Sequence, residues 1–465
     1  MSQPDRSQAQ ARAPLPRQSD LAALFAAVRD MHCMSVVGVS NLGKSALLRA
    51  LTDAITQRRF LDREAANYLP IYIDFNRMLD MTEQAFYELI LRCALDALNA
   101  RATAAASEAA ERVRAAYDAL VKPASSFQVP LSFAQAMAAI GDLLPEKVAF
   151  LFDELDGPVA GIDGRVFLNL RALKDKHWQG LTYVTATNRR LEQLGHDGNV
   201  AEFAELFSRH VFYIAPLNDD EMAEFVAGFA ADEDVTFSAD DLSFIRLWAG
   251  GHPGLLEGVC HLLGSLTGQP VRDPTQDWII QRRAAELIPQ DPNIQTECRH
   301  IWEDLTTQEQ DALMSFFRAP AEKDSPAFDS VIAQRLVLAQ GAERRIFARA
   351  FADFVQRQHV ARRPGPRGGL RVDSESGEVW VAGVQVPTLT NLEYRLLLLL
   401  YGRLGKIVTK YDVVEAVWGE DYIDEVDDAR IEKLVSRLRQ KIEPDIANPR
   451  YVITVRGRGY KLVDA

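Results

Sequence analysis

One eight-residue segment constrains the fold of the N-terminal half more than any other feature. Residues 38–45 read GVSNLGKS and fit the pattern G-x-x-x-x-G-K-S, with a strand-like run before them and a helical pattern after them. The glycines let the backbone curl so that successive N–H groups face a phosphate, and the start of the helix adds positive potential. The segment therefore predicts a strand–loop–helix unit that binds the phosphates of a nucleotide. A chance glycine-rich turn is the alternative, which the flanking strand and helix disfavour.

Two side chains of this loop carry specific chemistry. Lys44 can reach the β- and γ-phosphates of a nucleotide, and the hydroxyl of Ser45 can ligate Mg²⁺. We therefore expect ATP or ADP, together with Mg²⁺, at this site. The predicted nucleotide-binding residues of the loop are Gly38, Ser40, Asn41, Gly43, Lys44, Ser45 and Ala46.

A second apolar run, residues 147–152, ends in an acidic pair, Asp153 and Glu154. In enzymes with such a phosphate-binding loop, an aspartate at a strand end holds Mg²⁺ directly or through water. The adjacent Glu154 is placed to act as general base on the attacking water. An acidic pair after a strand is also common as a solvated turn, but the loop upstream favours the catalytic interpretation. Asp156 is expected to cap the next helix rather than to assist catalysis.

Two later turns follow strand-like or helical segments. The run 181–186 is followed by Thr187, Asn188 and two arginines, and a polar or cationic side chain there would lie beside the γ-phosphate. A plain polar loop is the alternative. Asn188 and Arg189 therefore join Lys44 and Glu154 as catalytic candidates. Residues 249–255 form a Gly/Pro turn that opens a helix, for which a simple helix–helix connection is the alternative.

Apolar runs that alternate with helical patterns predict an α/β fold for residues 18–215. The runs are 34–39, 69–75, 148–152 and 181–186. Continuous apolar strands separated by helices are typical of a parallel sheet with helices on both faces. The alanine-rich segment 100–118 predicts an exposed helical insertion rather than a partner-binding element. The predicted segments beyond this domain are a helical lid over 216–297, a winged-helix-like module over 298–360 and a Pro/Gly-rich linker over 361–369.

Composition narrows the class of protein. Hydrophobic residues make up 48% and charged residues 25% of the chain, which is ordinary for a soluble globular protein. No apolar run approaches the roughly 20 residues that span a bilayer. Residues 1–17 lack the apolar core of a signal peptide and predict a flexible tail. The four cysteines form no C-x-x-C pair, which disfavours a disulfide framework or a zinc site. We expect a cytoplasmic protein with no membrane partner.

The net charge of −13 conceals a basic region near the C-terminal end. Between positions 430 and 461 the sequence has nine basic residues and only three acidic ones. A helical pattern starts at Asp427 or Asp428 and ends near Ile442, with its apolar residues on one face. A neighbouring face carries Arg and Lys, which suit phosphates and guanine edges in a major groove. Such a helix alone is usually only a solvated face.

A hairpin after this helix favours DNA binding. The runs 451–455 and 460–463 flank a basic turn, RGRG, which forms a wing able to place arginine against a DNA backbone or in a minor groove. We therefore expect residues 370–465 to form an α+β winged-helix domain that binds double-stranded DNA. The predicted DNA contacts are Arg430, Lys433, Arg437, Lys441, Arg456 and Arg458.

The segments GVSNLGKS, KVAFLFDELD, TATNRR and GGHPGLL, in this order, resemble the STAND branch of AAA-like P-loop ATPases over residues 17–360. The resemblance implies a slow ATPase switch with ADP-closed and ATP-open states. It also implies a sensor role for Arg189 and nucleotide contacts from His252 and Pro253 in the lid. Arg209 is a weaker candidate for a subunit-interface arginine in a homo-oligomer. STAND proteins usually carry a long repeat array as ligand sensor, and no repeat is visible in this sequence.

The segments LTNLEYRLLLLLYGRLGKIVTKYDVVEAVWG, RIEKLVSRLRQKIE and YVITVRGRGYKLV resemble the OmpR/PhoB-type winged-helix effector domain of bacterial response regulators. The resemblance implies a recognition helix at 429–442 and a wing at 455–459. The loop 419–428 corresponds to one that contacts RNA polymerase in some family members, and its acidity fits a protein contact better than a DNA contact. An ATPase stands here in place of the phosphoryl-acceptor receiver domain.

Together these patterns predict a bacterial transcriptional regulator in which ATP hydrolysis to ADP and phosphate is a regulatory switch for DNA binding or oligomerisation. A second interpretation is a signalling or defence NTPase that uses the winged helix as a DNA sensor. A third, an interaction scaffold with a degenerate site, is disfavoured by the complete set of loop lysine, serine and strand-end acids.

Overall fold

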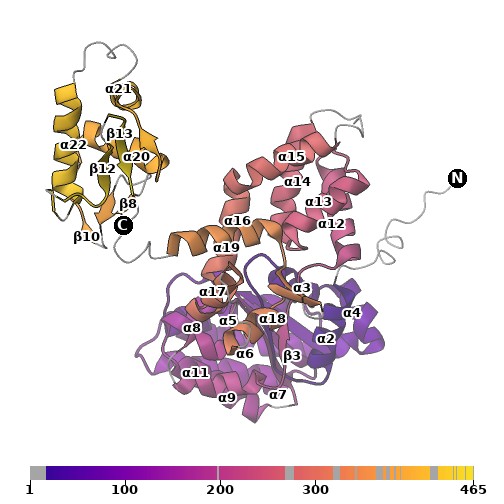
Figure 1. Ribbon diagram of the computed structural model, residues 1–465. Coiled ribbons are helices and arrows are strands. Elements are labelled where there is room, and N and C mark those ends of the chain that lie inside the picture. The colour runs from indigo at the N-terminus through magenta and orange to yellow at the C-terminus, as the bar shows by residue number, and fades with distance from the viewer. Residues whose placement is uncertain are drawn as a thin grey trace. The chain divides into compact units, whose positions relative to one another are not determined.

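A computed structural model divides the chain into two compact units, Met1–Gln358 and His359–Ala465 (Figure 1). The structure describes residues 17–177, 179–195, 198–267, 277–317, 325–340, 343–362, 370–372, 378–381, 384–387, 389–418, 428–443, 445–446, 448–455 and 457–463. Within these ranges no helix combines the length and the apolar character that crossing a membrane requires.

A five-stranded sheet of parallel strands lies at the centre of the first unit. In spatial order its strands are β2 (Tyr68–Asp74), β3 (Lys147–Asp153), β4 (Leu181–Thr187), β1 (Met34–Val37) and β5 (Val211–Tyr213). The predicted parallel sheet is thus confirmed, with β5 as an additional strand. The register pairs Val37 with Thr187 and Asp74 with Asp153, so the carboxyl ends of the strands meet at one edge.

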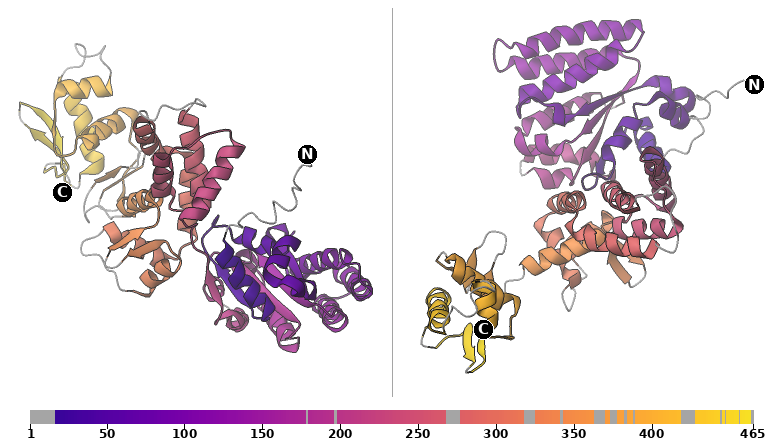
Figure 2. Two further views of the ribbon diagram at one scale, coloured as in Figure 1. Left: turned by 90° about the vertical axis from the view of Figure 1, so that its right-hand side faces the viewer. Right: turned by 90° about the horizontal axis from the view of Figure 1, so that it is seen from above.

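One face of the sheet is covered by a layer of helices that includes α5 (Glu83–Asn99), α6 (Ala104–Val121) and α7 (Gln128–Leu143), which lie side by side (Figure 2, purple in the right-hand view). The helix predicted over 100–118 is present, but it is exposed on one face only. The buried residues of α6 are Ala106, Ala109, Ala110, Val113, Ala116 and Leu120. Small alanine side chains at helical spacing allow close packing against neighbouring helices, and this face was mistaken for a solvated one.

The opposite face carries α2 (Gln18–Arg29), α3 (Lys44–Ala50) and α4 (Ala54–Leu61). Their hydrophobic cluster continues into the lid helices without a break. These are α12 (Asp219–Asp232), α13 (Ala239–Ala249), α14 (Pro253–Thr267) and α15 (Asp277–Leu287). The other described elements between residues 62 and 290 are η1 (Asp62–Asn67), η2 (Phe75–Arg77), α8 (Asp156–Gly161), α9 (Arg165–Lys176), α10 (Leu191–Leu194), α11 (Gly198–Ala204), η3 (Glu205–Phe207) and η5 (Ile288–Gln290).

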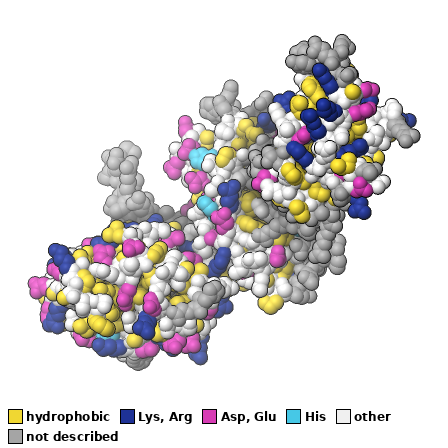
Figure 3. Space-filling view, turned by 90° about the vertical axis from the view of Figure 1, so that its left-hand side faces the viewer, with side chains coloured by type: hydrophobic (Ala, Val, Ile, Leu, Met, Phe, Trp, Pro, Cys, Tyr) yellow, Lys and Arg dark blue, Asp and Glu magenta, His cyan; other side chains and the backbone are white. Residues whose placement is uncertain are grey.

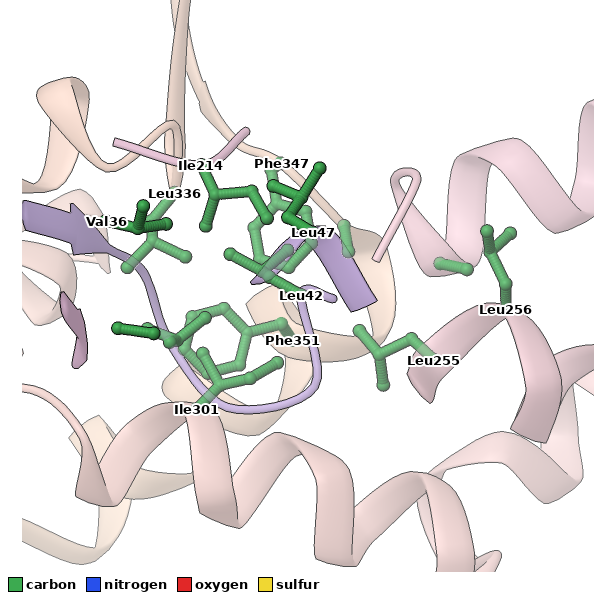
Figure 4. Packing of buried hydrophobic residues seen from close by; sticks show 14 of the residues in the cluster. Val36, Leu42, Leu47, Ile214, Leu255, Leu256, Ile301, Leu336, Phe347 and Phe351 are labelled. Carbon is green, nitrogen blue, oxygen red and sulfur yellow. The ribbon is translucent and has the colours of Figure 1, made fainter. Parts of the chain in front are cut away.

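Among the described residues, the predicted winged-helix-like module consists of four α-helices, a short 3-10 helix and a hairpin. Its elements are α16 (Pro292–Glu303), α17 (Thr307–Met314), η6 (Ser315–Phe317), α18 (Pro326–Ala333), β6 (Val337–Gln340), β7 (Glu343–Ile346) and α19 (Arg349–Arg362). The predicted boundary between 297 and 298 falls inside α16. Leu42 from the 38–45 loop packs with Ile301 and Phe351 of this module (Figure 4). The loop, the lid and the module therefore share one core.

The second unit has the order of elements expected of a winged helix. A three-stranded sheet of β8 (Leu370–Val372), β9 (Val379–Val381) and β10 (Val384–Gln385) comes first. The helices α20 (Asn391–Gly402), α21 (Lys410–Val417) and α22 (Asp428–Ile442) follow, with β11 (Ile407–Val408) between the first two. The hairpin of β12 (Val452–Val455) and β13 (Gly459–Leu462) completes the domain. Thr409 caps α21, because its hydroxyl accepts the Asp412 N–H at 3.1 Å.

Candidate nucleotide site and basic helix face

Lys44 begins α3 with its side chain folded back into the loop. Its Nζ donates hydrogen bonds to the carbonyl oxygens of Gly38 at 2.6 Å and Val39 at 3.1 Å, and to Asn188 Oδ1 at 2.7 Å. The side chain is only 6% exposed, and this burial lowers the pKa of Lys44. The carboxylate of Asp304 is the strongest of the neighbouring negative charges that oppose the shift. The cation thus lies where the carboxyl ends of β1 and β4 meet.

Asp153 ends β3 with its carboxylate buried. One oxygen, Oδ2, accepts a hydrogen bond from the Tyr72 hydroxyl at 2.5 Å, and the guanidinium of Arg49 lies 5.3 Å from the centre of the Tyr72 ring. The other oxygen, Oδ1, is buried and finds no hydrogen-bond partner among the described residues. An unpaired buried carboxylate oxygen is a suitable ligand for a hard cation such as Mg²⁺. Tyr72 was not predicted from the sequence, because only the parallel pairing of β2 with β3 brings it there.

Glu154 has a backbone φ of 57°, a left-handed conformation that residues other than glycine rarely adopt. Such local strain is characteristic of functional sites. Burial raises the pKa of its carboxyl group, and the charge of Lys44 opposes this shift. Asp156 was predicted to cap a helix, but its carboxylate accepts the N–H of Asn188 at 2.9 and 3.1 Å. It therefore positions Asn188 beside the lysine.

A cavity of about 710 Å³ opens beside the loop, in front of Glu154. Its volume lies in the range of about 300–1,000 Å³ that small-molecule and cofactor sites occupy. The predicted residues that line it are Asn41, Gly43, Lys44, Ser45, Ala46 and Pro253. The lid and α16 supply unpredicted lining residues, among them Phe225, His261, Asn293 and Glu297. Gly38, Ser40 and His252 do not line this cavity.

His252 contacts the loop backbone instead of the cavity. Its Nε2 lies 2.9 Å from the carbonyl oxygen of Ser40, and the imidazole is fully buried. Burial lowers the pKa of His252 to about 4, so the ring is neutral and donates from Nε2. The turn before it needs glycine: Gly251 has a φ of 81°, and a Cβ there would lie 2.2 Å from the carbonyl oxygen of Leu217. The start of α14 is thereby fixed to the 38–45 loop.

Arg189 was predicted to lie beside the terminal phosphate, and the structure places its side chain elsewhere. The guanidinium donates to three consecutive backbone carbonyls at the end of α16, those of Glu303 at 2.7 Å, Asp304 at 2.5 Å and Leu305 at 3.1 Å. Asp304 in turn accepts the Ser40 N–H at 2.6 Å and an Asn188 Nδ2–H at 2.8 Å. No local sequence pattern indicates this contact, because more than 100 residues separate α16 from each partner.

Two other arginines differ from their predicted settings. Arg17, assigned to the flexible tail, is buried, and its guanidinium donates to the carbonyl oxygens of Leu42 at 2.7 Å and Ala215 at 2.8 Å. It thus connects the loop to the chain beyond β5. Arg209 is exposed just before β5, at the amino end of the parallel sheet, whereas the loop follows the carboxyl end of β1. Within this chain it lies away from the site.

In the second unit, α22 separates its apolar and basic faces as predicted. The apolar side chains that it buries are Ile431, Leu434, Val435, Leu438 and Ile442. Arg430, Lys433 and Arg437 are exposed, as is Arg458 in the hairpin turn. Figure 3 shows a row of Lys and Arg side chains across this part of the molecule, at the upper right of the view. The exposed helix and the turn together offer cations to an extended anionic partner.

Not every predicted DNA contact is available in this face. The Nζ of Lys441 donates to Glu393 Oε2 at 2.8 Å, and the Glu393 carboxylate is almost fully buried, so this lysine serves the internal structure. Arg439, not predicted, donates to the carbonyl oxygen of Val452 at 2.9 Å and joins α22 to the hairpin. Arg456 and, apart from Asp428, the loop 419–428 lie outside the described residues.

Comparison with known proteins gives a clear match for the second unit. Residues 385–462 match the family model described as "Transcriptional regulatory protein, C terminal". The sensory transduction protein RegX3 of Mycobacterium leprae is 43% identical over 95 residues, which are 20% of this chain and 46% of the relative. The chain thus spans less than half the length of the first curated relatives that it matches.

Two solved structures are similar to different parts of the chain. The Walker-type ATPase paby2304 of Pyrococcus abyssi covers 73% of this chain and 95% of its own, at 14% identity and a TM-score of 0.45, which carries no argument about function. The DNA-binding domain of RstA from Klebsiella pneumoniae, solved with its RstA box, covers 21% of this chain and 92% of its own, at 27% identity and a TM-score of 0.19. The family match and the order of elements agree that the C-terminal unit contains a winged-helix domain of the OmpR/PhoB type.

Proposed function

We propose that the chain is a DNA-binding transcriptional regulator whose first unit binds and slowly hydrolyses ATP, and whose nucleotide state controls DNA binding or oligomerisation. The observation that carries the proposal is the cavity beside the phosphate-binding loop, which gathers Lys44, Ser45 and Glu154 in a chain that also holds a winged-helix domain. The predicted STAND-type lid and module, over 216–297 and 298–360, would close over the nucleotide. Each part supplies a separate chemical role.

In this proposal the loop holds the phosphates and the strand ends do the chemistry. Lys44 neutralises the β- and γ-phosphates, and the start of α3 offers backbone N–H groups to the same anion. Glu154 accepts the proton of the attacking water, for which a raised pKa suits a base that works near neutral pH. Asn188, held by Asp156, orients the lysine and the terminal phosphate. The lid residues Phe225 and Pro253 would line the opposite wall.

The residues present fit Mg²⁺, which when bound would neutralise charge on the phosphates. Asp153 Oδ1 is a buried carboxylate oxygen with no hydrogen-bond partner among the described residues, and Ser45 supplies a hydroxyl at the start of α3. Within the described ranges no group of three or more His, Cys, Asp or Glu side chains could hold a metal. A site with one or two protein ligands is what Mg²⁺ usually takes beside nucleotide phosphates. Tyr72 fixes the orientation of the Asp153 carboxylate.

The proposed DNA contacts divide between the helix and the turn. Arg430, Lys433 and Arg437 on α22 would enter a major groove, and Arg458 would contact the backbone or a minor groove. The 419–428 loop remains a proposed contact with RNA polymerase. The structural basis is the exposure of these cations on a helix whose other face is fully packed.

The DNA-face prediction compares substitutions in the full-length chain. Arg458→Ala should weaken binding to most sequences alike and reduce the slope of log affinity against log salt by about 1, because a phosphate contact is lost. Lys433→Ala should change sequence preference at one position by about 1–3 kcal/mol, because base contacts specify. Gel shifts with a randomised duplex library measure both. Lys406→Ala is the matched control and should leave DNA binding unchanged. Lys406 is exposed and directly precedes β11, which pairs with β13 at the end away from the basic turn. Unchanged binding in both test variants would contradict the proposed face.

The coupling prediction tests the proposed function as a whole. DNA affinity and molecular mass are compared for Glu154→Gln with ATP and for the wild type with ADP. We expect tighter DNA binding in the ATP state by roughly 5–150-fold, the usual size of a coupling between two sites. Assembly on adjacent half-sites could add avidity without any new contact. Equal affinity and equal mass in both states would leave two independent functions on one chain. Stimulation of ATP hydrolysis by DNA of many sequences would instead favour the DNA-sensor interpretation.

A further inference from the structure

The C-terminal end of α16 is anchored inside the phosphate-binding site. The guanidinium of Arg189 donates hydrogen bonds of 2.5–3.1 Å to the carbonyl oxygen of the last helical residue and to those of the two residues that follow it. A cation at a helix C-terminus is favourable because the unpaired carbonyls there carry partial negative charge. This anchor fixes the next side chain, that of Asp304, against the loop. The helix that begins the module thus ends among residues that the proposed function assigns to a nucleotide phosphate.

The Asp304 carboxylate accepts hydrogen bonds from the 38–45 loop and from the residue that follows β4. Oδ2 accepts the Ser40 backbone N–H at 2.6 Å, and Oδ1 accepts an amide N–H of Asn188 at 2.8 Å. The carbonyl oxygen of the same Asn188 amide accepts from Lys44 Nζ at 2.7 Å. One asparagine therefore links the loop lysine to a carboxylate from a different part of the chain.

A terminal phosphate would need the same groups. In the proposed function Lys44 and Asn188 contact the γ-phosphate, and a loop N–H is a natural phosphate donor. Two neighbouring anions in such a partly buried site repel each other. The carboxylate and a γ-phosphate therefore compete for one set of donors, whereas ADP has no γ-phosphate to compete with.

Resting on the proposed function, we propose that Asp304 is a built-in competitor of the γ-phosphate, which holds the 298–360 module on the loop with ADP and is displaced by ATP. Asp304 then determines how strongly the site discriminates ATP from ADP. A second carboxylate of α16 supports this role, because Glu297 accepts from the Asn41 side chain at 2.9 and 3.0 Å. The same helix thus contacts the loop at two positions.

Displacement of Asp304 would change the packing of the 298–360 module, because the loop and α16 share one hydrophobic core. Leu42, inside the loop, is buried, and in Figure 4 it lies close to Ile301 on α16 and Phe351 on α19. Such packed cores tend to have discrete arrangements rather than continuous ones. A purely structural role for Asp304 would make a different prediction: its loss would lower stability without separating ATP from ADP.

The test measures ATP and ADP affinity of full-length Asp304→Asn by titration calorimetry with Mg²⁺. Asparagine keeps the shape, and its single carbonyl oxygen can still accept the Ser40 N–H, but the negative charge and the acceptor for the Asn188 amide N–H are lost. We expect ATP to bind about tenfold more tightly than to the wild type, within the usual range of coupling between sites, and ADP affinity to change by less than about twofold. Glu303→Gln removes the same charge from an exposed neighbour and should change neither affinity.

The outcomes separate this inference from the proposed function. A wild type that binds neither nucleotide overturns both. If the wild type binds ATP, and the ratio of ATP affinity to ADP affinity is the same in Asp304→Asn as in the wild type, only the competitor role of Asp304 is overturned. Hydrogen exchange on the wild type gives a check that needs no variant: amides of residues 298–306 should exchange faster with a non-hydrolysable ATP analogue than with ADP. Equal exchange in both states also overturns the competitor.

Discussion

A Lys44→Ala variant is expected to bind ATP at least about a hundredfold more weakly than the wild type. Its ammonium group is the cation that the loop presents beside the cavity, and alanine offers nothing in its place. A hydrogen bond to a charged group contributes about 1.5–3 kcal/mol, so the loss of two phosphate contacts corresponds to about 3 kcal/mol or more. At 1.4 kcal/mol for each factor of ten, that loss gives the expected hundredfold change. Titration calorimetry with ATP and Mg²⁺ measures it.

The Lys44→Ala fold should survive, because the buried lysine is itself held at a desolvation cost that lowers its pKa. Removing it also leaves the Gly38 and Val39 carbonyls without this donor, so a modest fall in melting temperature is expected. Lys176→Ala, on an exposed position at the end of α9, is the matched control and should bind ATP normally. Unchanged ATP affinity in Lys44→Ala would remove the assignment of the phosphate-binding loop.

The parts of the fold that could be predicted from the sequence are those determined by patterns of neighbouring residues. The loop 38–45, the strand that ends at Asp153 and the helix that ends near Ile442 each follow from neighbouring residues: a glycine pattern, or apolar residues at strand or helical spacing. Strand β5 escaped prediction because three partly buried residues, Val211–Tyr213, form no distinct apolar run. Helix α6 was predicted as an exposed helix, and its polar face is exposed, but its buried face was missed because alanine side chains give only a weak apolar signal.

The parts of the candidate site that escaped prediction are supplied by distant segments. Tyr72 meets Asp153 through strand pairing, and Asp304 meets Ser40 across 264 residues. Neither contact leaves a short-range pattern. Arg189 shows the converse case: its position after β4 was predicted, but the direction of its side chain depends on the end of α16, which no local rule places there. Lys441 likewise lies on the predicted helix and pairs inward with Glu393.

The catalytic assignment depends on Glu154, and the Glu154→Gln variant isolates its role. Glutamine keeps the size of the side chain and lacks the basic carboxylate, so ATP binding should persist while the steady-state rate of hydrolysis falls by about 10²–10⁴-fold, the usual contribution of general-base catalysis. Phosphate release under saturating ATP measures the rate, and calorimetry on the same sample shows that nucleotide is bound. A loss of ATP binding together with hydrolysis would indicate that the substitution disrupts the nucleotide site, rather than removing only the general base.

Two substitutions make the result for Glu154→Gln specific. Glu111→Gln removes an exposed carboxylate from α6, away from the site, and should hydrolyse ATP at the wild-type rate. Asp156→Asn weakens the acceptor that holds the Asn188 N–H, so its defect should come through the position of Asn188 and be smaller. Near-normal turnover in Glu154→Gln, with a large loss in Asp156→Asn, would transfer the role of base to Asp156. The position of Glu154 argues against that transfer, because Glu154 lines the cavity whereas the Asp156 carboxylate already accepts the Asn188 N–H.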